Sequence, residues 1–241
     1  MKKRTVIAIA ACALACASAS SARAQEERQP TYSRQRVRAP RQAFEIGVST
    51  GYTQGLGKLR GGPGNNVGDV ADAGLGIGLN LGYRANPNVS IGVHNQYQEL
   101  KADNGLTNGT NVRGLVTGIE GSYHFMPYTR LDPWLSVGTG YRLMWEVPPG
   151  SNNNLLRHGF EIAKAQVGFD MRVSPDVAIA PTLGADLNMF VWENPEGSRG
   201  NQEIHDKRVN TFLYAGIQGR FDLGGVREPM PARVTAIGRR Y

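Results

Sequence analysis

The stretch AGLGIGLNLGY, residues 73–83, decides how the rest of the chain is interpreted. Large apolar side chains occupy every second position from Leu75 to Tyr83, and glycine or asparagine fills the positions between them. Because successive side chains of a strand point to opposite faces, this period of two indicates a strand with one apolar face and one small or polar face. No helical pattern follows the glycines and no Gly-Lys-Ser/Thr sequence accompanies them, so we do not interpret the run as a phosphate-binding loop.

Further stretches of the chain alternate in the same way. The full set covers residues 44–52, 73–83, 89–97, 115–125, 135–145, 163–173, 177–191 and 209–221. Their lengths approach or exceed the roughly 9–11 residues that a tilted strand needs to cross a bilayer, whereas strands of soluble proteins average about 5–6 residues. The predicted fold class is all-β: an eight-stranded, antiparallel, up-and-down transmembrane β-barrel over residues 44–223.

The connections between these strands alternate in length. The short ones cover residues 85–88, 126–131 and 174–176, and the longer ones cover about 54–72, 103–109, 146–157 and 194–207. Short turns at one end and longer loops at the other are typical of outer-membrane barrels, whose short turns face the periplasm. An even number of strands places both chain ends on the short-turn side. We therefore expect both termini in the periplasm and the loop residues Asn65, Asn104, Asn153 and Arg199 on the cell surface.

The first 24 residues have the features of a secretory signal peptide. Residues 1–4 are basic, residues 5–17 are mostly apolar, and an Ala-Arg-Ala sequence ends at Ala24. These features in this order predict cleavage between Ala24 and Gln25. The apolar run is too short to span a bilayer as a helix, which takes about 20 residues.

Both cysteines of the chain, Cys12 and Cys16, lie within this predicted signal peptide. Cleavage at Ala24 would leave a mature chain without cysteine, so neither disulfides nor thiolate metal sites are expected. Lipoprotein processing, with Cys12 or Cys16 carrying the lipid, is the alternative.

The formal net charge of +7 is concentrated outside the predicted barrel. Lys2, Lys3, Arg4 and Arg23 would leave with the signal peptide, and the remaining excess of arginine lies in residues 25–43 and 224–241. We expect these segments to be flexible, basic and periplasmic. Nucleic-acid-binding domains carry basic charge on a folded face, so a nucleic-acid partner is not expected.

The face opposite the apolar one carries ionisable side chains in balanced numbers. The predicted lumen network consists of Glu45, Arg84, Glu120, Arg142, Lys164, Asp170, Arg172, Asp186, Arg220 and Asp222. His94, His124, Gln96, Gln166, Asn188, Asn210 and Gln218 would extend it. An unpaired buried charge costs several kcal/mol, so these groups must pair with each other or with water. An eight-stranded barrel has little free interior, which favours an ionic plug over a narrow water path, although both remain open.

Aromatic residues lie near the strand ends on the apolar face. The predicted girdle consists of Tyr83, Tyr123, Phe125, Tyr141, Trp145 and Phe221. Aromatic girdles flank the lipid-facing band of outer-membrane barrels. The alternation alone does not say which face is inside, so a soluble lipocalin-like binding barrel is a further alternative.

Catalysis has little support in this sequence. The small barrels that act on lipid need an activated hydroxyl beside a base, and the one Ser near a His is Ser122, two residues before His124. Both would face the lumen, away from lipid. No His-x-x-His pair or carboxylate-rich loop suggests a metal, so we expect neither enzyme activity nor a cofactor nor a bound metal.

The stretch DPWLSVGTGYR, residues 132–142, resembles the P-[YW]-x-x-x-G-x-G-[YW] strand of the small outer-membrane β-barrel superfamily, OmpA-like in the broad sense that includes OmpX- and OmpW-like proteins. The strand YAGIQGRF, residues 214–221, is similar to their assembly signal but has Gly219 where a hydrophobic residue is usual. The resemblance covers residues 44–223. The residues that follow are too few for the peptidoglycan-binding domain of OmpA.

This family includes adhesins, structural anchors and slow pores, so the resemblance implies architecture more than task. We expect a structural or surface-interaction role, in envelope integrity or adhesion. A narrow porin-like channel for small solutes is the alternative. The implied partners are outer-membrane lipid, lipopolysaccharide and the barrel-assembly machinery, with peptidoglycan or anionic lipid as partners of the basic tails. We expect a monomer.

Overall fold

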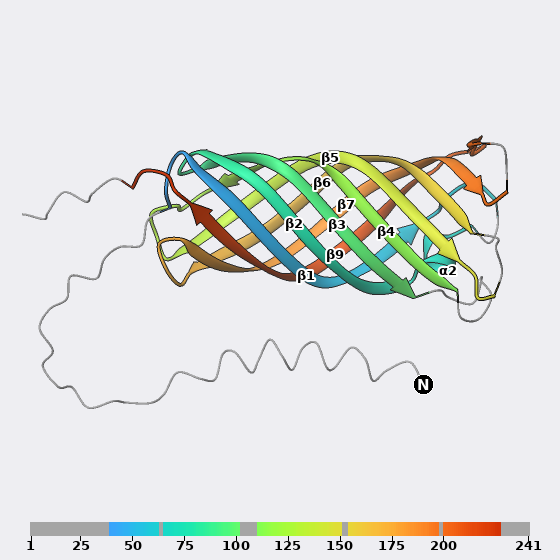
Figure 1. The fold of residues 1–241 in the computed structure, drawn as a ribbon, viewed down its shortest axis with the longest axis horizontal. Coiled ribbons are helices and arrows are strands. Elements are labelled where there is room, and N and C mark those ends of the chain that lie inside the picture. Colours follow the sequence, from blue (N-terminus) through green and yellow to red (C-terminus); the bar gives the residue numbers. More distant parts are fainter. Residues whose placement is uncertain (1–38, 63–64, 102–109, 151–153, 198–199, 228–241) are drawn as a thin grey trace, which may run out of the picture. The chain divides into compact units, whose positions relative to one another are not determined.

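The structure, a computed structural model, describes residues 39–62, 65–101, 110–150, 154–197 and 200–227. The signal peptide, its cleavage site and most of the two basic tails lie outside these residues, as do Asn104, Asn153 and Arg199. Long strands make up most of the described part (Figure 1). Their bounds are β1 Ala43–Gly57, β2 Ala73–Asn86, β3 Val89–Lys101, β4 Asn111–His124, β5 Leu131–Val147, β6 Leu155–Arg172, β7 Val177–Pro195 and β9 Val209–Leu223. Two small elements are α2 Val67–Val70 and β8 Gln202–Glu203.

The long strands form a closed antiparallel ring. Each strand pairs with its sequence neighbour from β1 to β7, β7 pairs with β9, and β9 pairs with β1 to close the barrel. The short strand β8 pairs only with the loop end of β7 and lies outside the ring. The predicted eight-stranded, up-and-down barrel is confirmed.

The two ends of the barrel differ as the connection lengths predicted. At the turn end the connections are residues 87–88, 125–130 and 173–176. At the loop end they are residues 58–72, 102–110, 148–154 and 196–208. Both described chain ends lie at the turn end, where Arg41 and Val226 exchange backbone hydrogen bonds of 3.0 and 2.8 Å.

Strand β6 is longer than its alternation predicted, because a bulge interrupts the alternation. The sequence pattern begins at Ala163, but β6 begins at Leu155. Ile162 and Ala163 are both exposed, and the pairing with β7 skips a position between Glu161 and Ala163. An extra residue reverses which side chains point inward. As a result Glu161 points inward before the bulge and Lys164 points inward after it.

Facing glycines allow neighbouring strands to curve tightly around the lumen. Gly51 of β1 is paired with Gly216 of β9, and a Cβ at Gly51 would lie 2.3 Å from the carbonyl O of Ala215. Gly82 and Gly92 form an equivalent pair on β2 and β3, and a Cβ at Gly92 would lie 2.6 Å from Cα of Gly82. Gly51, Gly92 and Gly216 therefore have no room for a larger residue.

The apolar face of every long strand points away from the barrel interior. Leu75 is 68% exposed, and Phe44, Ile91 and Leu183 are exposed to a similar degree. A soluble protein does not present a continuous apolar surface of this kind to water. A lipocalin-like barrel would bury this face, so that alternative is contradicted. None of the helices in the described residues has the length and apolar character to span a membrane.

Candidate functional site in the barrel lumen

The strands bring the predicted ionic residues together in the lumen. Arg84, Arg142, Lys164, Asp170, Arg172, Asp186, Arg220 and Asp222 are buried, and Glu45 and Glu120 are half-buried. They divide into two groups along the barrel axis. We call them the turn-end cluster and the mid-lumen cluster.

The turn-end cluster is built around three arginines: Arg84, Arg172 and Arg220. Arg84 donates to Glu45 at 2.8 Å, and Arg172 donates to Asp222 at 2.8 Å. Arg220 lies 2.8 Å from Asp170 and 3.0 Å from Glu45, and its guanidinium also lies over the ring of Trp134. Each buried charge therefore has an opposite charge in contact, which buried ions require.

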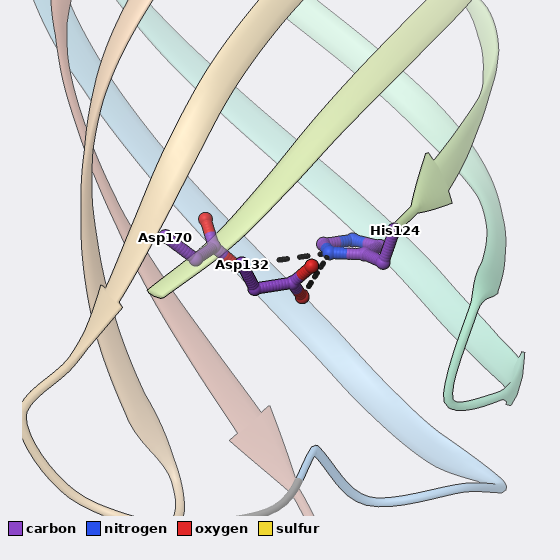
Figure 2. Close-up of side chains that lie close together, drawn as sticks. All are labelled: His124, Asp132 and Asp170. Atoms are coloured by element: carbon purple, nitrogen blue, oxygen red, sulfur yellow. Dashed lines mark hydrogen bonds and ion pairs between the residues drawn. The ribbon is translucent and has the colours of Figure 1, made fainter. Parts of the chain in front are cut away.

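His124 and Asp132 complete the turn-end cluster (Figure 2). The Nδ1 atom of His124 lies 2.8 Å from Oδ2 of Asp132, and its Nε2 atom lies 2.8 Å from Arg220 and 3.3 Å from Arg84. An arginine has only donors, so Nε2 must accept and Nδ1 must carry the hydrogen. His124 is therefore a neutral ring that donates to Asp132.

His124, Asp132 and Asp170 have ligand-type atoms within 4.8 Å of one another, so we asked whether they fit a metal. Oδ1 of Asp132 already accepts from the backbone N–H of Met126 at 2.9 Å. Asp170 accepts from Trp134 Nε1 and from Arg220, both at 2.8 Å. Since these donors and the positive charge of the arginines occupy the ligand atoms, the residues fit a hydrogen-bond network better than a metal site.

The mid-lumen cluster joins strands across the barrel. Glu120 accepts from Lys164 at 2.9 Å and from Asn80 at 2.5 Å. His94 Nε2 lies 2.8 Å from Glu161 Oε2. The guanidinium of Arg142 donates hydrogen bonds to three further members of the cluster. These are Asp186 at 3.2 Å, Gln98 at 2.7 Å and Asn188 at 2.8 Å. These bonds fill the barrel cross-section with polar side chains.

Two small cavities lie among these side chains in the described part of the chain. The polar lumen contains cavities of about 20 and 10 Å³, lined by Asn80, Gln166 and Gln218 in both cases. A cavity needs about 10–15 Å³ to hold one water molecule. Each cavity therefore has space for about one water molecule.

Two buried carboxyl groups of these clusters were missed by the sequence analysis: Asp132 and Glu161. The sequence analysis had matched five carboxyl groups with five Arg and Lys side chains, and these two carboxyl groups are additional. Glu161 lies 2.8 Å from His94, and Asp132 lies 2.8 Å from His124. Glu161 was missed because of the bulge at residues 162–163. Strict alternation extended backward from Ala163 would place Glu161 on the outer face. The doubled apolar pair Ile162-Ala163 was the one signal in the sequence that could have revealed it.

The loop end of the lumen is apolar. The ionic plug expected from the sequence did not include an apolar part. The loop-end cap, as we call it, consists of Leu59, Val67, Val70, Ala71, Leu100, Val112, Met144, Phe190, Ile204 and Phe212. Helix α2 of the first loop contributes Val67 and Val70, and it lies at the loop end of the barrel (Figure 1). Phe190 and Phe212 alternate with outward-facing neighbours on β7 and β9, but only the folded loops supply their apolar partners.

The first and fourth loops are also joined to each other. Gly61 donates a backbone hydrogen bond to the carbonyl O of Asp206 at 2.9 Å, and the backbones of Arg60 and Lys207 form an isolated antiparallel β-bridge. Ile204 donates to Val191 at 2.9 Å and places its side chain in the loop-end cap. The cap is therefore held by backbone bonds as well as by apolar packing.

The predicted girdle residues all lie on the outer face. Tyr83, Tyr123, Phe125 and Phe221 are exposed near the turn end, while Tyr141 and Trp145 are half-exposed toward the loop end. Tyr141 bonds His158, which stacks on Trp192 with ring centroids 5.5 Å apart. His158 and Trp192 were missed because their strands continue past the predicted boundaries.

The closed ring and its apolar exterior define the class of protein: an eight-stranded β-barrel of the outer-membrane type. A search of solved structures agrees. Neisserial surface protein A has 12% sequence identity and a TM-score of 0.50, with 74% of this chain and 96% of that chain covered. Outer membrane protein OprG from Pseudomonas aeruginosa has 14% identity and a TM-score of 0.49, with 76% and 98% covered.

The similarity to Neisserial surface protein A concerns the fold alone, and it confirms the architecture that the sequence resemblance implied. No protein-family model matches the chain, and no curated protein matches it.

Proposed function

We propose that this protein is a non-catalytic outer-membrane barrel with a structural or surface-interaction role. The observation that carries the proposal is the filled lumen. Paired charges occupy its turn end and middle, the cavities among them measure about 20 and 10 Å³, and the buried apolar side chains of the loop-end cap lie at the other end. A barrel closed in this way is suited to anchoring and contact rather than to passage of solutes.

The joined first and fourth loops support a role in surface contact. Arg60 on the first loop lies 3.8 Å from Glu193 on β7, and Gly61 is bonded to the fourth loop. Ordered loops lose little conformational entropy when they bind, so they are effective contact surfaces. We assign the loop end to the cell exterior and the turn end to the periplasm, as in barrels with this asymmetry.

The proposed partners follow from this placement. The apolar exterior would contact the acyl chains of outer-membrane lipid and lipopolysaccharide, and the barrel-assembly machinery would insert the chain. Arg41 and Arg130 add basic charge at the turn end, where they would favour anionic lipid head groups or peptidoglycan.

Planar-bilayer conductance tests the filled lumen. We expect no steady conductance from the full-length protein inserted in the bilayer. Heat-modifiable gel mobility of the same preparation serves as the control for insertion. A variant with both Phe190→Ser and Phe212→Ser, which removes two rings of the loop-end cap, should also stay silent, because the turn-end and mid-lumen clusters still fill the lumen. Silence of the inserted unmodified protein and of this variant would support a plug, whereas conductance of the variant would support a pore closed only by the loop-end cap.

A narrow pore is the second candidate, and the polar column formed by the turn-end and mid-lumen clusters favours it. A pore would require the loop-end cap to move. Steady channels whose conductance changes in Arg142→Gln or Glu120→Gln would support the pore and contradict the plug.

A further inference from the structure

Asn95 is a polar residue on the lipid-facing side of the barrel. It lies on β3 between the outward-pointing residues Val93 and Tyr97, which are 44% and 40% exposed. Thr117 of β4 is directly opposite on one side, and Leu79 of β2 is opposite on the other. Asn95 therefore points away from the lumen network, into a surface that consists mostly of apolar side chains.

The position along β3 places Asn95 inside the lipid-facing band. It is six residues from Val89, which pairs with the girdle residue Tyr123, and four residues from Glu99, which pairs with Arg113. With a rise of about 3.3 Å per residue and a tilt of about 40°, these separations correspond to roughly 15 and 10 Å of depth. Lipid head groups do not reach this depth.

The Asn95 side chain has no hydrogen-bond partner among the described residues, and the same holds for the hydroxyl of Thr117. Among the described outward-facing strand residues between the two aromatic bands, Asn95 alone carries an amide. Acyl chains offer neither donors nor acceptors, so a carboxamide exposed to them is costly. An intramembrane polar residue of this kind indicates an interaction site.

We propose that Asn95 and Thr117 form the centre of an interface with a second copy of this chain. A carboxamide donates and accepts hydrogen bonds, so two Asn95 side chains related by a twofold axis satisfy each other reciprocally. Thr117 provides an additional hydroxyl at the edge of the pair. Polar side chains join membrane-embedded protein segments in this way. The inference rests on the membrane location proposed above, and it replaces the expected monomer with a dimer.

The apolar neighbours of Asn95 are compatible with this interface. Val93, Tyr97 and Ile119 project from the same surface of β3 and β4 and are 44%, 40% and 60% exposed. Close packing of these side chains around the central amide pair would exclude lipid from it. A second copy of this chain necessarily presents the same amide at the same depth in the membrane. Any other partner would need a matching polar group at that depth.

Cysteine cross-linking in outer membranes tests the interface. The background is the full-length chain with Cys12→Ala and Cys16→Ala, so that an introduced cysteine is the only one. The matched control is Leu183→Cys, because Leu183 faces outward from the middle of β7, on the opposite wall of the ring. We expect mild oxidation to give disulfide-linked dimers of Asn95→Cys and at most one tenth as much of Leu183→Cys. Equal cross-linking of the two would overturn the proposal.

The association of cysteine-free protein in lipid vesicles gives a second measurement. We expect Asn95→Leu to lower the association constant at least tenfold by energy transfer between labelled chains. Thr50→Leu, a control at another outward-facing polar position, should change it less than twofold, and Asn95→Gln should retain most of the dimer. A monomeric unmodified protein, or equal association of Asn95→Leu, would contradict the interface. Heat-modifiable gel mobility distinguishes loss of the dimer from failure of the proposed membrane location. A chain that does not insert would show neither heat-modifiable mobility nor association, whereas an inserted monomer would still show heat-modifiable mobility.

Discussion

Nε2 of His94 on β3 lies 2.8 Å from Oε2 of Glu161 on β6, and the contact spans the lumen between strands that are not neighbours in the ring. Both side chains are 1% exposed. Nδ1 of His94 lies 3.9 Å from Glu120, so the ring lies between Glu161 and the pair formed by Glu120 and Lys164. The pair therefore connects strands β3 and β6 across the lumen.

Removal of one partner of this pair should destabilise the barrel. We expect Glu161→Ala to lower the free energy of unfolding by about 3 kcal/mol, because it removes the hydrogen-bond partner of His94 and a carboxylate whose charge acts on the buried Arg142. Urea titration in lipid vesicles would measure the loss. The double variant with His94→Ala should lose less than the sum of the single variants, and strictly additive losses would show that the two residues do not interact.

A methyl group at the closing seam of the ring should also destabilise the fold. Gly51→Ala places its Cβ against Ala215 and Gly216, and overpacking of this kind costs about 1–3 kcal/mol. Gly121→Ala is the matched control, because the nearest atom to its Cβ would be 3.8 Å away. The same urea titration compares them, and equal stability would argue against a tight approach of β1 and β9.

Adjacent residues of β9 should differ sharply in their contribution to stability. Phe212 is 1% exposed in the loop-end cap and lies under the guanidinium of Arg142, whereas Leu213 is 40% exposed on the outer face. We expect Phe212→Ala to cost about 3–5 kcal/mol because it leaves a cavity. Leu213→Ala should cost clearly less, since lipid can occupy the vacated space. A larger loss in Leu213→Ala would reverse the assignment of inside and outside.

Labelling of intact cells would test the orientation of the barrel. Asn65 lies in the first loop at the loop end, and Arg130 is exposed in a turn-end connection. In the background without Cys12 and Cys16, Asn65→Cys should react with a membrane-impermeant maleimide on intact cells. Arg130→Cys should react only after the outer membrane is permeabilised. The opposite pattern would invert the topology.

The fourth loop carries a carboxyl group whose titration can be measured outside the membrane. The hydrogen bond and the charge of Lys207, 2.5 Å away, hold the pKa of Glu203 below its ordinary value of 4.5. The contact is therefore complete above pH 4.5 and is lost as pH falls through the lowered pKa. NMR titration of Lys207→Ala should show the pKa of Glu203 rise, and an unchanged pKa would mean that the contact does not form in solution.

Much of the lumen could be predicted because the period of two assigns every residue of a regular strand to a face. Arg84, Lys164 and Asp222 were placed correctly from position alone. Glu161 was not, because one bulge shifts the parity and the sequence marks it only by two consecutive apolar residues. Asp132 was missed because its strand begins earlier than its apolar pattern, with Leu131 and Pro133 beside it.

The sequence alone determined the strand count, the outward or inward direction of most side chains and the asymmetry of the two ends, because these depend on local alternation and on turn residues. Only the tertiary structure decided which charge pairs with which, since partners such as His94 and Glu161 are 67 residues apart and meet through strand register and shear. The loop-end cap had the same origin: Leu59, Val67 and Phe190 come from separate segments, and only closure of the ring and folding of the first loop bring them into one apolar cluster.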